Sequence, residues 1–200
     1  MKKCFFIILS FLFITVVNSQ EKKWNHILEG GIITYGPGTK DLGFSFRTIH
    51  GYKVYSNLKV GAGSGFEKFI LDNDDDHKLV PIFLQAKYDL ASSKKSNFFG
   101  AFDIGYGVNL GKEKKSTFEK SDYDGGILLS PQLGLKRNFK NAKQGMYLLL
   151  GYKIQHVEKQ SAYKYRHQLF NSSTNNDEYD SYETKRYNLQ RLSVMIGFEF

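Results

Sequence analysis

The feature that most constrains this chain is a period-two alternation of apolar and polar residues, which runs from about residue 24 to the final residue. In the last segment Leu192, Val194 and Ile196 share one face, and Arg191 and Ser193 share the other. Successive side chains of a strand point to opposite faces of a sheet, so the pattern predicts β-strands. Polar turns divide it into eight segments, at about residues 24–35, 41–50, 56–69, 79–91, 97–110, 126–139, 145–158 and 186–200.

Strands of this length match the dimensions of a membrane-spanning barrel. A strand of about ten residues tilted by about 45° covers roughly 24 Å of depth, close to the apolar band of about 25 Å on outer-membrane barrels. Strands cross lipid only as a closed barrel, because each backbone N–H and C=O group then finds a partner. The predicted fold class is therefore all-β, an eight-stranded antiparallel up-and-down transmembrane β-barrel.

The first 19 residues are predicted to be a signal peptide, which makes residues 20–200 the mature barrel. Lys2 and Lys3 precede the apolar stretch 5–17, and Val17, Asn18 and Ser19 resemble a small-residue cleavage site. A membrane-anchoring helix is the alternative, but such a helix needs about 20 apolar residues. No later stretch has the length of a spanning helix, so the periplasm, the outer membrane and the medium are the possible destinations.

Cysteine usage excludes several kinds of site. Cys4 is the only cysteine, and it precedes the apolar stretch, whereas a lipid-anchored protein carries its cysteine just after that stretch. Cleavage leaves a chain without cysteine, which excludes disulfides and thiolate metal sites. The acidic run 72–76 lacks the Gly and Glu that an EF-hand requires, so a solvated loop is favoured and an irregular surface site for a divalent cation is the alternative. No cofactor and no metal are predicted.

The connections alternate in length, which predicts how the barrel is oriented. Short links at 51–55, 92–96 and 140–144 alternate with longer ones at 70–78, 111–125 and 159–185, although the first link, 36–40, is short as well. Outer-membrane barrels combine short periplasmic turns with longer outer loops. We therefore expect a bacterial outer-membrane protein with both termini in the periplasm.

Alternation alone does not decide which face meets lipid, and a secreted lipocalin-like barrel with its apolar face inside is the main alternative. The polar face also carries glycines such as Gly105 and Gly134, which suit the narrow interior of an eight-stranded barrel. A Lys or Arg facing lipid at mid-depth would cost about 2–4 kcal/mol, so we expect the charges to pair inside a plugged lumen. The predicted lumen charges are Arg47, Lys59, Glu67, Lys87, Asp103, Lys136, Lys153, Arg191 and Glu199.

Four stretches, 100–110, 126–137, 148–155 and 191–200, resemble the small OmpA/OmpX-type barrels and the short barrels described as "outer membrane protein beta-barrel". The resemblance covers about residues 24–200. It implies fold and location but no activity, because such barrels host unrelated functions. It also implies that the outer-membrane assembly machinery reads the end of the chain, at Phe200, Phe198, Ile196 and Val194.

The charge balance and the last connection bear on partners. Cleavage leaves 26 basic and 20 acidic residues, a net charge of +6, for which outer-membrane lipid is a more plausible counterpart than nucleic acid, although solubility of the loops explains it equally well. The last connection mixes Tyr with Ser and Asn, as recognition surfaces do, and its partner would be an extracellular protein or glycan. The alternative is that the flanking strands simply continue as a hairpin. The residues concerned are Tyr163, Tyr165, Arg166, Tyr179 and Tyr182.

The predicted function is structural or surface-interacting, exerted by a monomer through its outer loops. A narrow solute channel and a lipid-modifying outer-membrane enzyme are the alternatives. For the enzyme, His156 is the one candidate base, and no Ser or acid lies at an obvious matching depth on the neighbouring segments. No catalytic residue is predicted.

Overall fold

The computed structural model describes residues 23–35, 42–71, 75–93, 95–110, 114–115, 119–139, 144–163 and 181–200. The predicted signal peptide, residues 1–19, lies outside these ranges. Within the described residues no helix has the length and apolar character needed to cross a membrane. Eight long strands make up most of the fold: β1 Trp24–Thr34, β2 Leu42–Lys53, β3 Leu58–Leu71, β4 Asp75–Ser92, β5 Ser96–Asn109, β8 Gly126–Asn138, β9 Gly145–Tyr163 and β10 Ser181–Glu199.

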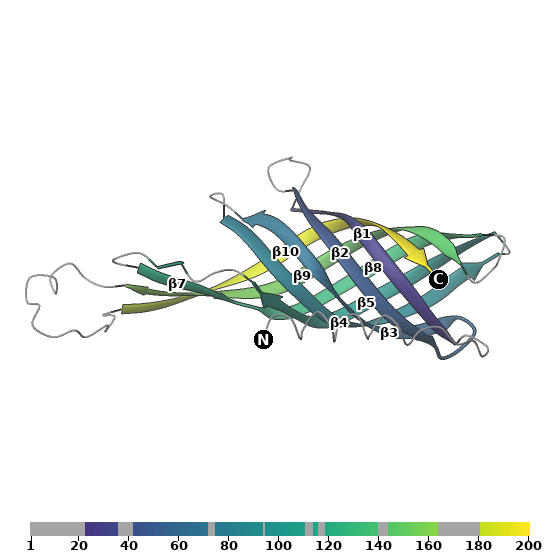
Figure 1. Ribbon diagram of the computed structural model, residues 1–200, viewed down its shortest axis with the longest axis horizontal. Helices are drawn as coiled ribbons and strands as arrows, with labels where there is room; N and C mark the ends of the chain where they lie inside the picture. The colour runs from purple at the N-terminus through teal and green to yellow at the C-terminus, as the bar shows by residue number, and fades with distance from the viewer. Residues whose placement is uncertain are drawn as a thin grey trace, which may run out of the picture.

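These eight strands close on themselves into an antiparallel barrel (Figure 1). Each strand pairs with the one before it in this series, and β10 pairs with both β9 and β1. The closing pair runs from Ile27 opposite Glu199 to Thr34 opposite Leu192. The predicted fold class is therefore confirmed, and closure leaves no barrel strand with an unpaired edge.

The apolar face of each strand points outwards. On β10 Leu192, Val194 and Ile196 are 38–54% exposed, whereas Arg191 and Ser193 are at most 5% exposed. The other barrel strands alternate in the same sense. The lipocalin-like arrangement, with the apolar face inside, is therefore wrong for this chain.

The interior is less polar than the sequence analysis predicts. One buried apolar cluster includes Ile49, Phe83 and Phe99, and a second one consists of Ile33, Leu79, Val157 and Leu189. In a barrel of eight strands the lumen is only wide enough for side chains, so bulky residues fill it. Apolar residues fill this space without the unsatisfied hydrogen bonds that additional polar groups would leave.

Part of the sheet continues beyond the barrel. β9 and β10 stay paired from Gln155 opposite Leu189 as far as Tyr163 opposite Ser181. The short strand β7 Glu119–Asp124 pairs with β9, and β6 Lys114–Lys115 pairs with β7. We call this extension the fin: β6, β7, residues 158–163 of β9 and residues 181–186 of β10. Figure 1 shows it projecting from one end of the barrel.

The fin corrects the predicted ends of the last two segments. The connection predicted at 159–185 is strand as far as Tyr163 and again from Ser181, so the hairpin alternative is confirmed for these residues. The connection predicted at 111–125 likewise contains β6 and β7. These strands carry polar residues on both faces, so they lack the alternation of apolar and polar residues from which the barrel strands are predicted.

A β-bulge marks the boundary between barrel and fin. Asp124 of β7 lies opposite Glu158, whereas Leu128 of β8 lies opposite Gln155, so the β7–β8 side carries one extra residue. Gly125 and Gly126 occupy this step. A Cβ atom on Gly125 would overlap the carbonyl oxygen of Gly107, and one on Gly126 would overlap that of His156. The close approach of these backbones therefore requires glycine.

Candidate functional site

The predicted lumen charges all lie on the inner face of the barrel, where they form three groups. Eight of them are buried, and the side chain of the ninth, Lys59, is 17% exposed. A tenth interior charge, Glu29, was missed by the sequence analysis. Its position in the alternation of the first segment, between Leu28 and Gly30, could have revealed it. The Tyr147 hydroxyl donates a hydrogen bond of 2.5 Å to this carboxylate.

The first group gathers three lysines around one carboxylate near the end of β10. Glu199 accepts contacts from Lys59 at 2.5 Å, Lys87 at 3.1 Å and Lys136 at 3.0 Å. The Lys87 ammonium also lies 4.0 Å from the ring centroid of Phe99, within the range of a cation–π interaction. One carboxylate therefore holds the cations of three different strands, and this end of the interior carries an excess of positive charge.

The second group is centred on a bridging guanidinium. Arg47 of β2 donates to Glu29 of β1 and, at 2.6 Å, to Asp103 of β5. The amides of Gln85 and Gln132 also donate to Asp103, at 2.9 and 2.5 Å. The contact between Arg47 and Asp103 crosses the lumen and joins β2 with β5, which are not neighbours in the sheet, whereas the other contacts of this group join adjacent strands.

The third group is centred on Glu67 of β3. Its carboxylate accepts hydrogen bonds from Lys153 of β9 and, at 3.1 Å, from Ser45. The Arg191 guanidinium lies 3.7 Å from its second oxygen and donates to Gln155 at 3.0 Å. The three groups together place six cations and four carboxylates inside the described barrel. This arrangement can hold the strands in register.

The residues predicted to carry the assembly signal lie on the outer face of β10 and at its end. Phe200, Phe198, Ile196 and Val194 are all exposed, and Phe200 exchanges two backbone hydrogen bonds with His26 of β1, at 3.0 and 2.9 Å. The end of the chain is thus built into the seam where the barrel closes. Recognition of these four residues by the outer-membrane assembly machinery stays a prediction.

Of the predicted recognition residues, the structure describes Tyr163 and Tyr182, and both lie in the fin. Tyr165, Arg166 and Tyr179 lie outside the described residues. Tyr182 is 76% exposed, whereas the Tyr163 hydroxyl donates a long hydrogen bond of 3.5 Å to Glu183. Glu183 also accepts a hydrogen bond from Lys185, and this contact raises the pKa of Lys185 above its usual value.

A hollow of about 700 Å³ lies at the root of the fin, on the outer side of the sheet. It contains His156, the candidate base of the enzyme alternative, whose side chain is exposed as expected. Two acids share its lining: Asp124 of β7, which lies in the predicted connection 111–125, and Glu158 of β9, the strand that carries His156. Among the described residues that line the hollow there is no Ser, Thr or Cys, so it offers His156 no nucleophile of those types to activate.

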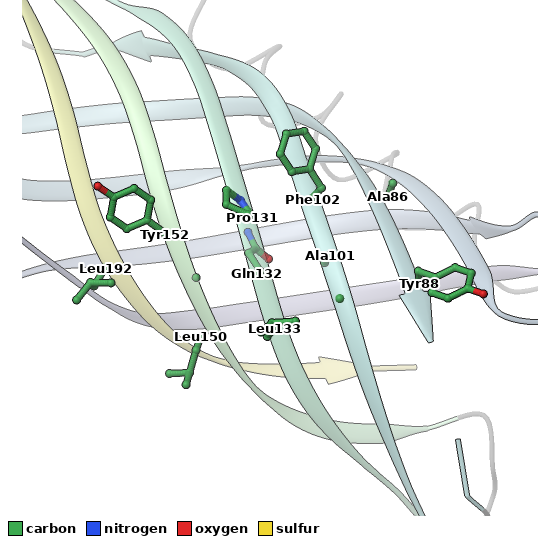
Figure 2. A pocket seen from close by; sticks show the side chains of 12 residues that line it. Ala86, Tyr88, Ala101, Phe102, Pro131, Gln132, Leu133, Leu150, Tyr152 and Leu192 are labelled. Carbon is green, nitrogen blue, oxygen red and sulfur yellow. The ribbon is translucent and has the colours of Figure 1, made fainter. Parts of the chain in front are cut away.

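A second depression, shown in Figure 2, lies on the apolar outer wall of β5, β8 and β9. Small residues, among them Ala86 and Gly100, form part of its lining, and Tyr88, Tyr152 and Leu192 project around it. Pro131 lies in a gap of the β8–β9 ladder, which pairs Leu129 with Ile154 and next pairs Gln132 with Gly151. Proline has no N–H group to donate, which explains an interrupted ladder at this point. The lining is almost entirely apolar and fits contact with acyl chains.

Comparison with known proteins bears on the fold. No family model matches the sequence, and the search of curated proteins gives no significant match. Among solved structures, the chain is similar to the outer membrane protein OprG from Pseudomonas aeruginosa, with a TM-score of 0.57 and 12% identity over 88% of this chain and 95% of that one. This chain has the fold of a small outer-membrane β-barrel.

Two further structures overlap with most of the chain at lower similarity. Neisserial surface protein A gives a TM-score of 0.44 with 15% identity over 88% of this chain and 96% of that chain. The N-terminal β-barrel domain of Pseudomonas aeruginosa OprF gives 0.47 with 10% identity over 90% of this chain and 100% of that domain.

Proposed function

We propose that the protein is a monomeric barrel of the bacterial outer membrane, and that its closed interior makes it a rigid anchor for a recognition surface on the fin. The observation that carries this proposal is the continuous pairing of β9 and β10, which runs without interruption from the barrel into the fin. A sheet that extends a rigid barrel keeps its side chains in a fixed arrangement, and this lowers the entropic cost of binding a partner.

The membrane placement rests on the outer wall. Apolar residues predominate on the outward face of all eight strands, and an apolar surface of this extent would not remain exposed to water on a monomer. Aromatic residues such as Trp24 and Tyr52, whose rings meet edge to face at 5.2 Å, lie near the strand ends, where aromatic girdles occur.

Because Trp24 and Phe200 lie at the end with the short links, we place both termini in the periplasm. A cysteine placed in the link 54–57 should then be protected from impermeant thiol reagents in intact cells.

The interior supports an anchor rather than a channel. Arg47 and Arg191 are both about 1% exposed, and each lies within a group of ion pairs that spans the lumen. Moving such side chains aside would separate buried charges, which is costly. In planar lipid bilayers we expect no steady open-channel current from the folded protein. A reproducible conductance would contradict the closed interior.

A matched pair of tyrosines tests recognition by the fin. Tyr182 in the fin and Tyr55 in the link after β2 are both strongly exposed, at 76% and 66%. The protein in lipid nanodiscs is applied to a glycan array and to purified extracellular proteins. We expect Tyr182→Ala to weaken whatever binding is found by about tenfold or more, and Tyr55→Ala to leave it unchanged. Equal effects of the two substitutions, or no binding by the unmodified protein, would overturn the recognition role.

A further inference from the structure

The hollow at the root of the fin has a polar half and an apolar half. Tyr106 and Ile127 line it on the barrel side, and both belong to the exposed apolar wall. Asp124, Glu158 and Arg186 line it on the fin side. The volume of about 700 Å³ is within the range of sites that hold small molecules. The hollow therefore lies where the lipid-facing wall gives way to the polar fin.

The backbone bulge contributes two glycines to the lining of this space. Gly125 and Gly126 carry no side chain, and the close backbones beside them leave no room for one. The extra residue between β7 and β8, opposite β9, also bends the chain at this point. The main chain of the bulge forms one part of the lining, and exposed side chains such as Arg186 form the rest.

The polar lining of the hollow contains charged groups that are held by hydrogen bonds and other groups whose hydrogen-bonding capacity is unused. Arg186 donates through Nε to Glu158 at 2.7 Å, and Gln160 donates to Asp124 at 2.9 Å. These contacts hold the two carboxylates while leaving one oxygen of each, and two guanidinium nitrogens, open to a ligand. Among the described residues, neither the His156 ring nor the Asn188 amide has a hydrogen-bond partner. The lining of the hollow therefore offers both hydrogen-bond donors and hydrogen-bond acceptors to a ligand.

The charge of the lining narrows the class of ligand. Two carboxylates and one guanidinium leave one excess negative charge, which disfavours an anionic group such as a phosphate. Sugar hydroxyls each donate and accept hydrogen bonds, so they match a lining of carboxylates, amide and guanidinium, and the exposed ring of Tyr106 offers an apolar surface for a sugar. We propose that the hollow binds the saccharide head group of an uncharged glycolipid in the outer leaflet.

A glycolipid fits the hollow better than a free sugar does, because of the apolar side of the site. Tyr106 and Ile127 continue into the lipid-facing wall, so the acyl chains of a bound glycolipid would lie along it without leaving the membrane. This inference rests on the proposed membrane placement. It does not depend on what the exposed end of the fin binds.

The test uses the folded protein in phosphatidylcholine nanodiscs, with diglucosyl diacylglycerol as the probe. The ring resonances of His156, assigned with a His156→Gln variant, report binding by NMR. Phosphatidylcholine with the same acyl chains is the lipid control, and the free disaccharide is the control for a soluble sugar. The test variant is Asp124→Ala with Asn188→Ala, both at exposed positions, and the matched control is Glu183→Ala elsewhere in the fin.

We expect saturable shifts with diglucosyl diacylglycerol, and an affinity at least about tenfold lower in the double variant but unchanged in Glu183→Ala. Equal shifts with the lipid control, an absence of shifts, or an unaffected double variant would overturn the proposal. Saturation by the free disaccharide at the same concentration would overturn the assignment to a lipid. Flotation with liposomes separates these outcomes from failure of the membrane placement, because a protein that does not float has lost both proposals.

Discussion

The barrel interior and the fin each contain an Arg–Glu ion pair across neighbouring strands, but in opposite environments. The side chains of Arg47 and Glu29 are 2% and 1% exposed, whereas those of Arg186 and Glu158 are 82% and 37% exposed. In the interior, a charge that loses its partner stays buried and unsolvated, whereas in the fin water replaces the partner. The same two residue types therefore form a buried ion pair in one region and a solvent-exposed ion pair in the other.

The interior should show the largest effect. Arg47→Met removes the cation between Glu29 and Asp103 and leaves two buried carboxylates without it. We expect a loss of about 3–5 kcal/mol in the free energy of unfolding, measured by urea titration in liposomes. A loss below about 1 kcal/mol would show that water reaches this group, and the contrast between the two regions would then fail.

The lipid-facing wall should come next. Ile104 lies outward at mid-strand in β5, and Ile104→Arg places a charge in the hydrocarbon layer. We expect a cost of about 2–4 kcal/mol in the same titration. Tyr182→Arg in the fin is the control and should stay within about 0.5 kcal/mol of the unmodified protein. Similar values for both would mean that the wall of β5 does not face lipid.

Crowding inside the barrel should have a smaller effect. A Cβ atom on Gly105 would overlap the carbonyl oxygen of Ile82, whereas one on Gly30, which faces outwards, would lie 3.8 Å from the Phe46 ring. Gly105→Val is therefore expected to cost about 1–3 kcal/mol, and Gly30→Val far less. Heat-modified gel mobility compares the fraction of each variant that folds, and a better-folded Gly105→Val than Gly30→Val would contradict the packing.

The fin should show the smallest effect on stability. Arg186→Met removes the exposed ion pair with Glu158, and we expect a change of about 0–1 kcal/mol that disappears in high salt. The measurement is the urea titration at two salt concentrations. A loss comparable to that of Arg47→Met would mean that the fin contributes to the stability of the barrel, and the two regions would then be one cooperative unit.

Most of the barrel was predictable from the sequence, because in β10 and β9 the alternation of apolar and polar residues translates directly into outward and inward positions. The fin was not predictable in the same way. Glu158, Gln160 and Tyr182 lie on strand segments that are exposed to water. Such segments need no apolar face, so the two-residue alternation of apolar and polar residues is missing from their sequence. Glu29 was missed because the first segment has glycines at 30 and 31, which weaken the contrast between its two faces.

The hollow at the fin root shows a different limit. Asp124 and His156 are 32 positions apart in the sequence, and both line the hollow because β7 and β8 pair with β9 on either side of a one-residue bulge at Gly125 and Gly126. A glycine pair in a sequence is compatible with a turn, a flexible link or a bulge. Only the pairing of β7 and β8 with β9 shows which of these it is.

The sequence alone determined the eight barrel strands, their spacing and which face of each strand is apolar, because each depends on the local geometry of an extended chain. The tertiary structure decided which charges pair, how far the sheet continues and where a ligand could bind. Lys59 and Glu199, for instance, are separated by 140 positions and meet at 2.5 Å. Their contact depends on barrel closure, and the two-residue period of a strand carries no information about which residue lies across the lumen.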